Sequence, residues 1–261
     1  MHHLRIMEGD YRGLRLHLRL EKDGSGVLVI NASRVVFLNK IATKIVHDFI
    51  RGENEEHTLK SLLKRYKVDV EIARKDIRET LFAVNSLAKT PDLCPVSYLN
   101  VEKIEPFQKE LSAPYRMDLA LTYRCNNKCI HCYAGGPKQT SELTTEEWFR
   151  VIDKLHALGI PQVVFTGGEP TLRDDLAKLI AYLEKMELVA GLVTNGRKLK
   201  DRKYLKSLID AGLDHVQITV ESHDPKVHDR ITGADGSWKE TVRGLRNALA
   251  SPIYTVSNTT L

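Results

Sequence analysis

The stretch Met117-Asp-Leu-Ala-Leu-Thr-Tyr-Arg-Cys125-Asn-Asn-Lys-Cys129-Ile-His-Cys132-Tyr133 decides the fold of the second half of the chain. Its first residues, 117–122, are apolar enough to form a buried strand. Three cysteines follow that strand within one short loop. Three soft thiolates can hold three irons of a cubic iron–sulfur cluster and leave the fourth iron without a protein ligand.

The same cysteines have two other chemical uses. Together with His131 they could form a Cys₃His zinc site, and two of them could form a disulfide. Structural zinc ligands usually come as two separated pairs, whereas all these candidates share one loop. The chain has four cysteines, three of them in that loop, which is not a disulfide framework and indicates the reducing cytoplasm.

Strands and helices alternate on both sides of this loop. We expect strands at 117–122, 163–166, 188–194, 215–220 and 253–259. A capping box from Thr144 to Glu147 begins the first helix, and its buried face is expected to run from Trp148 to Leu158. Repeated β–α units with short loops predict an α/β fold, a partial (β/α) TIM-type barrel with a parallel sheet and helices outside.

Glycine-rich or polar stretches follow the first four expected strands. In barrels of this kind, the chemistry takes place where the strands end. We therefore expect all four stretches to gather on one rim. They are the cysteine loop, Gly167-Gly168-Glu169-Pro170, Thr194-Asn195-Gly196 and Glu221-Ser222.

The cysteine spacing, the following Tyr133 and the Gly167–Pro170 stretch resemble the radical S-adenosylmethionine (radical SAM) superfamily, from roughly Pro114 to the end of the chain. The resemblance implies a [4Fe-4S] cluster held by the three loop cysteines, with S-adenosyl-L-methionine on the open iron. It implies an enzyme that generates a 5′-deoxyadenosyl radical by reductive cleavage of S-adenosylmethionine. It also implies an electron donor such as a ferredoxin or flavodoxin, but it identifies no catalytic residue.

The same resemblance assigns the cofactor-binding residues. Gly167 and Gly168 would let the backbone approach the methionine amino group, Glu169 would accept from that ammonium, and Pro170 would fix the turn. Tyr133, after the third cysteine, also belongs to the predicted cofactor-binding set. The remaining predicted residues are Thr194 and Asn195 for the methionine carboxylate, Gln217, Thr219 and Glu221 for the ribose, and Arg230 for a carboxylate. For Gln217, Thr219 and Glu221 the alternative is a polar barrel interior without ligand contact, and for Arg230 it is a surface salt bridge.

The first ninety residues show a different pattern. Residues 14–20 alternate apolar and polar side chains, which predicts a half-buried strand, and strands at 27–30 and 35–38 precede three helices. This small α+β, winged-helix-like unit resembles the peptide recognition element related to the pyrroloquinoline quinone synthesis chaperone. That resemblance implies a leader peptide bound by strand augmentation. An intramolecular scaffold and a DNA-binding winged helix are the alternatives.

We expect three segments: a peptide-recognition domain at 1–92, a linker at 93–114 that holds Cys94, and a radical SAM core at 115–261. The expected core stops after its fifth strand where the family has six, so we expect a truncated chain or one completed by a partner. The 39 basic and 34 acidic residues are nearly balanced, and we expect no nucleic acid partner. No apolar run is long enough for a membrane span.

These observations predict a radical SAM enzyme that modifies a peptide or builds a peptide-derived cofactor. Its partner would be a leader peptide or a small-molecule precursor. A maturation enzyme for haem, tungsten or another small cofactor is one alternative. A zinc-stabilised winged-helix regulator is another.

Overall fold

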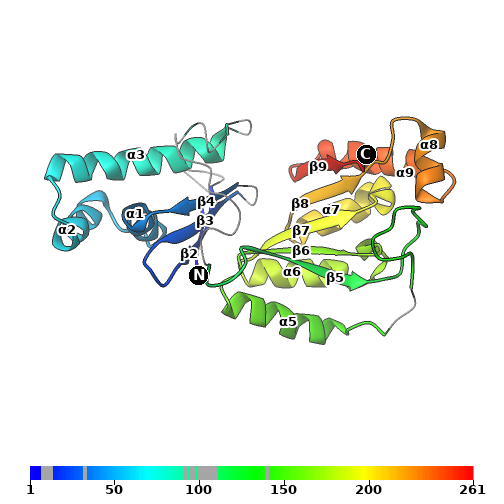
Figure 1. Ribbon diagram of the computed structural model, residues 1–261, viewed down its shortest axis with the longest axis horizontal. Helices are drawn as coiled ribbons and strands as arrows, with labels where there is room; N and C mark the ends of the chain where they lie inside the picture. Colours follow the sequence, from blue (N-terminus) through cyan, green and yellow to red (C-terminus); the bar gives the residue numbers. More distant parts are fainter. Residues whose placement is uncertain are drawn as a thin grey trace. The chain divides into compact units, whose positions relative to one another are not determined.

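The computed structural model describes residues 1–6, 14–31, 34–90, 93–94, 98, 111–138 and 141–260. The chain separates into two compact units, Met1–Tyr115 and Arg116–Leu261 (Figure 1). Most of the expected linker lies outside the described residues, and its last residues, 111–114, belong to the first unit. No described helix combines the length and the apolar character that a membrane span needs.

The first unit is a four-stranded antiparallel sheet in the order β1-β2-β3-β4, followed by three helices. All the expected elements are present, and β1 is additional. Its sequence shows no apolar alternation, and it forms by pairing with β2, where Leu4 lies opposite Leu16. The elements are β1 (His2–Arg5), β2 (Arg15–Leu20), β3 (Gly26–Ile30), β4 (Arg34–Leu38), α1 (Lys40–Ile50), α2 (Glu55–Arg65) and α3 (Val70–Lys89).

Side-chain caps and a leucine-rich core define this unit. Asn39, Asn54 and Asp69 each accept a hydrogen bond from a backbone N–H in the first turn of the helix that follows. Leucines of β2 and β3 pack against Val46 of α1 and Leu87 of α3. The helices therefore cover one face of the sheet.

The expectation of a half-buried strand at β2 is wrong, because both of its faces are buried. Arg19 is 3% exposed, and its Nε lies 2.7 Å from Oε1 of Glu21. Arg19 also donates to the carbonyl of Pro114, and Glu21 accepts from the backbone N–H of Ser112. Residues 112–114 therefore bind the polar side of the strand.

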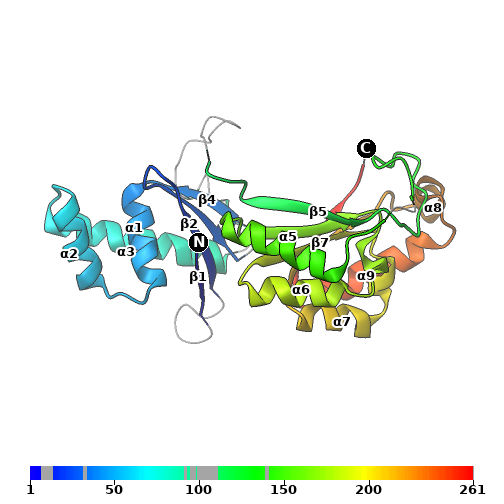
Figure 2. The ribbon, with the colours of Figure 1, turned by 90° about the horizontal axis from the view of Figure 1, so that it is seen from below.

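The second unit is a parallel sheet of five strands in sequence order, β5-β6-β7-β8-β9, which confirms the α/β partial barrel. Helices α5, α6 and α7 lie along one face of this sheet (Figure 2). Because the strands are parallel, their carboxyl ends meet at one edge. The elements are β5 (Arg116–Thr122), α5 (Thr145–Ala157), β6 (Gln162–Gly167), η1 (Pro170–Leu172), α6 (Leu176–Lys185), β7 (Val189–Thr194), η2 (Arg197–Lys200), α7 (Arg202–Asp210), β8 (Leu213–Thr219), α8 (Pro225–Thr232), α9 (Ser237–Leu249) and β9 (Tyr254–Asn258).

Burial explains most of these elements. Val163, Val164 and Phe165 of β6 are fully buried in a row, as expected for a strand covered on both faces. The capping box at the start of α5 is confirmed. Leu158 was expected in the buried face of α5 but is 60% exposed, because it is the C-cap residue beyond the last helical turn. Helix α8, whose buried residues include His228, was not predicted.

Candidate active site

A cavity of about 300 Å³ lies at the carboxyl ends of the strands in the second unit. The three loop cysteines line it, together with residues from the other strand ends. The fold thus brings residues from five successive strand ends together. The other predicted site residues that line the cavity are Tyr133, Gly167, Gly168, Thr194, Asn195, Gln217, Thr219 and Glu221.

Three predicted residues do not line this cavity: Glu169, Pro170 and Arg230. Arg230 is exposed on α8. Pro170 is buried as the first residue of η1, where its fixed backbone angle suits the start of a helix. Neither Pro170 nor Arg230 therefore contacts the cavity in which a cofactor is predicted to bind.

Glu169 is fully buried and binds other parts of the rim. Its Oε1 accepts from the hydroxyls of Thr171, at 2.6 Å, and Thr194, at 2.7 Å. Its Oε2 accepts from the backbone N–H of Asn195 at 2.8 Å. Burial raises the pKa of this carboxyl group, and the surrounding donors oppose that shift. The side chain thus fixes the end of β7 against the turn after β6.

The two glycines before it are required by contacts within the protein. A Cβ on Gly167 would lie 2.2 Å from the carbonyl oxygen of Thr122, and one on Gly168 would lie 2.3 Å from that of Arg124. The backbone N–H of Gly168 also donates to Thr122 at 2.7 Å. The absence of side chains therefore lets the end of β6 pack directly on the stem of the cysteine loop.

The far end of the cysteine loop is held by α8. The backbone N–H of Lys128 donates to the carbonyl of Thr232 at 2.7 Å, and that of Ile130 donates to Ile231 at 2.9 Å. Gly233 follows with φ +59°, and a Cβ there would lie 2.7 Å from the carbonyl oxygen of Lys128. The short helix α8, which was not predicted, is therefore part of the support for the cysteines.

The near end of the loop is held by an ion-pair network. Arg124 Nε lies 2.8 Å from Oε1 of Glu142, and Arg173 Nη1 lies 3.1 Å from Oε2 of the same carboxylate. Arg173 also pairs with Asp175 at 2.7 Å. Hydrogen bonds with Arg124 are the main reason why the pKa of Glu142 is lowered. The loop thus leaves the sheet between two fixed points.

Residues 119–261, more than half of the chain, match the family model of the radical SAM superfamily. The chain belongs to this superfamily. The Fe-coproporphyrin III synthase of Methanosarcina barkeri is 40% identical over 129 residues, which are 49% of this chain and 32% of that protein. The PqqA peptide cyclase of Rhodopseudomonas palustris is 36% identical over 140 residues, which are 52% of this chain and 36% of that protein. The match thus spans about a third of the length of each relative.

A solved structure extends the likeness to the first unit. Streptococcus suis SuiB, bound to its precursor peptide SuiA, has a TM-score of 0.60 against this chain, with 16% sequence identity. The alignment covers 94% of this chain and 55% of SuiB. At this level of identity, the likeness concerns the fold.

Radical SAM proteins use a [4Fe-4S] cluster and S-adenosylmethionine, and the cysteine loop fits the cluster. The backbone N–H of Asn127 points to Sγ of Cys125 at 3.4 Å, as a donor to a ligating sulfur would. Burial raises the pKa of the Cys125 thiol, and it raises that of Cys129 to about 11. Metal binding would displace these protons, so that cluster assembly should be favoured by higher pH.

The positions of the side chains do not support the alternative of a Cys₃His site for one zinc ion. Within the described ranges, no group of three or more histidine, cysteine, aspartate or glutamate side chains converges on a point where one metal ion could be held. His131, the fourth ligand of the Cys₃His hypothesis, is instead paired with Glu221, with Nε2 and Oε1 3.1 Å apart. The described side chains therefore show no preformed site for a single zinc ion.

Glu221 lines the cavity and has one carboxylate oxygen without a hydrogen-bond partner among the described residues. Its side chain is 2% exposed, and the oxygen in question is Oε2. Its backbone N–H donates to Nδ1 of His228 at 3.1 Å, which requires an unprotonated nitrogen there. Burial lowers the pKa of His228, in agreement with a neutral ring. A buried, unpartnered carboxylate oxygen at a cavity fits a ligand that brings hydroxyl or ammonium donors, as S-adenosylmethionine does.

The prediction missed several residues that line the cavity. Thr166 and Asn258 lie at the carboxyl ends of β6 and β9, so the rule that identified the other rim residues could have identified these two. Thr232 comes from α8, and no sequence signal placed it at the cysteines. The other missed residues are Asn127, Ala134, Gly136, Pro137, Val193 and Thr260.

Proposed function

We propose that this protein is a radical SAM enzyme that modifies a peptide. The observation that carries the proposal is the cavity in which three cysteines meet the buried acceptor of Glu221. When bound, the cluster and S-adenosylmethionine together supply a carbon radical that can take a hydrogen atom from an unactivated carbon. The residues of the chain supply the binding, the orientation and the exclusion of water.

The cavity residues have distinct tasks in this proposal. Cys125, Cys129 and Cys132 hold the cluster. Gln217 and Thr219 of β8 face the cavity beside Glu221, and their polar groups would orient the ribose. In a closed site these hydrogen bonds are stronger than in water, because the local dielectric constant is lower.

Tyr133 joins the cysteine loop to the end of β6. Its hydroxyl lies 3.4 Å from the carbonyl oxygen of Gly167, while the ring itself is 83% exposed. An exposed aromatic ring at the mouth of a cavity can cover a bound ligand. We assign Tyr133 the task of shielding the cofactor from water.

Two comparisons support a peptide substrate. SuiB, whose fold matches 94% of this chain, was crystallised with its precursor peptide, and a PqqA peptide cyclase matches about half of the chain. The first unit has sheet edges at β1 and β4, because each of these strands pairs on one side only within the described residues. An extended leader peptide could add a strand to such an edge. Phe37 of β4 is 38% exposed, and it would supply apolar contact to that peptide.

The radical SAM activity is tested by anaerobic reconstitution of the whole chain with iron and sulfide. We expect four irons per chain, and formation of 5′-deoxyadenosine from S-adenosylmethionine with a strong reductant. Cys129→Ala should lose both the cluster and the product. Cys94→Ala, an exposed cysteine of the first unit, is the matched control and should retain both. A full cluster and normal cleavage in Cys129→Ala would refute the assignment.

The peptide partner is tested separately, by selection from a displayed library of random peptides against the whole chain. Phe37→Glu places a charge on the proposed docking edge and should abolish enrichment. Val70→Glu makes the same kind of change at the 44% exposed start of α3 and should leave enrichment intact. No enrichment with the unmodified chain would remove the peptide partner and leave the radical SAM assignment standing.

A second candidate is the maturation of haem or another small cofactor. The 40% identity to Fe-coproporphyrin III synthase favours it, but that match covers 49% of the chain, whereas the likeness to SuiB covers 94%. If the peptide selection described above gave no enrichment, that result would favour this second candidate. Membership of the radical SAM superfamily argues against the zinc-stabilised regulator.

A further inference from the structure

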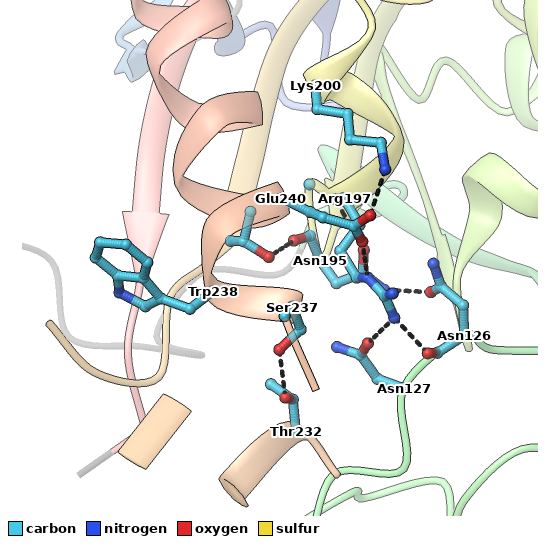
Figure 3. Close-up of polar contacts among 12 residues, drawn as sticks. Asn126, Asn127, Asn195, Arg197, Lys200, Thr232, Ser237, Trp238 and Glu240 are labelled. Carbon is cyan, nitrogen blue, oxygen red and sulfur yellow. Dashed lines mark hydrogen bonds and ion pairs between the residues drawn. The ribbon is translucent and has the colours of Figure 1, made fainter. Parts of the chain in front are cut away.

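One arginine from the end of β7 clamps the cysteine loop. Arg197 is the first residue of η2, and its side chain is 17% exposed. Its Nη1 donates to the backbone carbonyl of Asn126 at 2.5 Å and to Oδ1 of Asn127 at 2.8 Å (Figure 3). Both asparagines lie between the first two cysteines, so the guanidinium is bonded to the segment that sets their separation.

The peptide bond between the two asparagines joins this arginine to a cysteine sulfur. Its carbonyl oxygen accepts from Arg197, and its N–H is the group that points to Sγ of Cys125 at 3.4 Å. The C=O and N–H of a trans peptide point in opposite directions. The guanidinium and the sulfur therefore lie at the two ends of one peptide dipole. A cation at the oxygen end polarises the peptide and strengthens its N–H as a donor.

Two further contacts hold this arrangement. The side-chain amide of Asn195 donates to Oδ1 of Asn126 at 2.7 Å. Glu240 of α9 accepts from Nε of Arg197 at 2.6 Å, and it also pairs with Lys200 (Figure 3). Burial would raise the pKa of Glu240, but its bonds to Lys200 and Arg197 lower it, so the group is a carboxylate. Its negative charge partly offsets the field of Arg197 at the peptide.

We propose that Arg197 is a positioning residue that raises the reduction potential of the cluster on the cysteine loop, and that Glu240 limits this effect. The inference rests on the proposed function, because it requires a cluster ligated by Cys125. An added electron makes the cluster more negative. A stronger N–H donor to a ligating sulfur and a nearby cation both stabilise the reduced form.

The sign of the effect separates this role from simple structural support. Replacing Arg197 removes a positive charge, so reduction should become harder. Replacing Glu240 removes a negative charge from the same network, so reduction should become easier. Loss of loop structure alone has no reason to move the potential in opposite directions in the two variants.

The test is a redox titration of the anaerobically reconstituted whole chain, followed by electron paramagnetic resonance of the reduced cluster. At the potential where the unmodified cluster is half reduced, Arg197→Gln should show an about tenfold lower ratio of reduced to oxidised cluster, which is about 59 mV for one electron. Glu240→Gln should raise that ratio. Lys206→Gln is the matched control, because it removes one charge from an exposed pair with Asp210 on α7, and it should leave the ratio unchanged.

Iron content shows whether a negative result counts against the proposed function or only against the role of Arg197. An unmodified chain that binds no cluster would refute the proposed function, and this inference with it. A loaded Arg197→Gln chain with an unchanged or higher potential would overturn only the inference. If Arg197→Gln does not load, Glu240→Gln decides, because it leaves the arginine in place: a raised potential supports the inference, and an unchanged or lower potential overturns it.

Discussion

Replacing Gly168 by alanine should disturb the cysteine loop through a single methyl group. The new Cβ would lie 2.3 Å from the carbonyl oxygen of Arg124, the residue before Cys125. This neighbour is backbone, so it cannot move aside as a flexible side chain can. The oxygen would have to retreat by about 1 Å before ordinary van der Waals contact is restored, and Cys125 would move with it.

The cost follows from the contacts at this point. Overpacking of a closely packed site costs about 1–3 kcal/mol. The hydrogen bonds from Gly168 N to Thr122 O, 2.7 Å, and from Glu169 N to Arg124 O, 2.8 Å, would also be strained, at about 0.5–1.5 kcal/mol each if lost. The free energy of unfolding of the second unit should therefore fall by about 2–6 kcal/mol.

Tryptophan fluorescence during urea unfolding measures this free energy. The chain has two tryptophans, Trp148 and Trp238, and both belong to the second unit. The signal therefore reports the unit that carries the change. Iron content after anaerobic reconstitution is the second measurement, and we expect it to fall below half of the value of the unmodified chain.

Gly236→Ala is the matched control in the same unit. That glycine has φ +76°, and no atom lies within 4 Å of the position that an added Cβ would take, so the substitution tests backbone strain without a clash. It should cost about 1–2 kcal/mol and leave the iron content unchanged. Equal stability and full iron in both variants would refute the steric argument for Gly168.

Two further predictions concern buried ionisable groups. Glu169→Ala removes the acceptor for the hydroxyls of Thr171 and Thr194 and should cost about 3 kcal/mol or more. Glu169→Gln keeps one acceptor oxygen and should cost less in the same urea assay, whereas equal losses would contradict this role. Burial lowers the pKa of His215 from 6.5 to about 4, so its ring is neutral in the folded protein at pH 7. Its contribution to stability is present above pH 6.5 and is lost as the pH falls towards 4, by up to about 3 kcal/mol. His215→Gln should flatten this pH dependence between pH 7 and 4.5, and an unchanged slope would show that another group is responsible.

Local sequence patterns were sufficient for much of the fold. Apolar runs such as 163–165 predict buried strands, and the capping box at Thr144 predicts the start of α5, because both depend on residues close together in the sequence. The alternation of strands and helices then requires a parallel sheet. In such a sheet the strand ends share one edge, and that rule placed most of the predicted rim residues around one cavity.

Elements without a local signal were missed. β1 contains His2 and His3 and forms because β2 offers it a partner strand. α8 has a largely polar sequence, and its end is bonded to the backbone of Lys128 in the cysteine loop. The exposure of Leu158 was also predicted wrongly, since helical periodicity does not show where a helix ends.

By itself, the sequence determined the order of the elements, the cysteine loop and the edge of the sheet where the site lies, because spacing and periodicity express local geometry. Only the tertiary structure decided what individual side chains do there. It showed that Glu169 binds Thr171 and Thr194 and that the space beside Gly168 is filled by Arg124. It also brought Arg197 to Asn126, seventy-one positions away in the sequence. The physical reason is that a hydrogen bond depends on distance in space, and folding sets the distance between residues that are far apart along the chain.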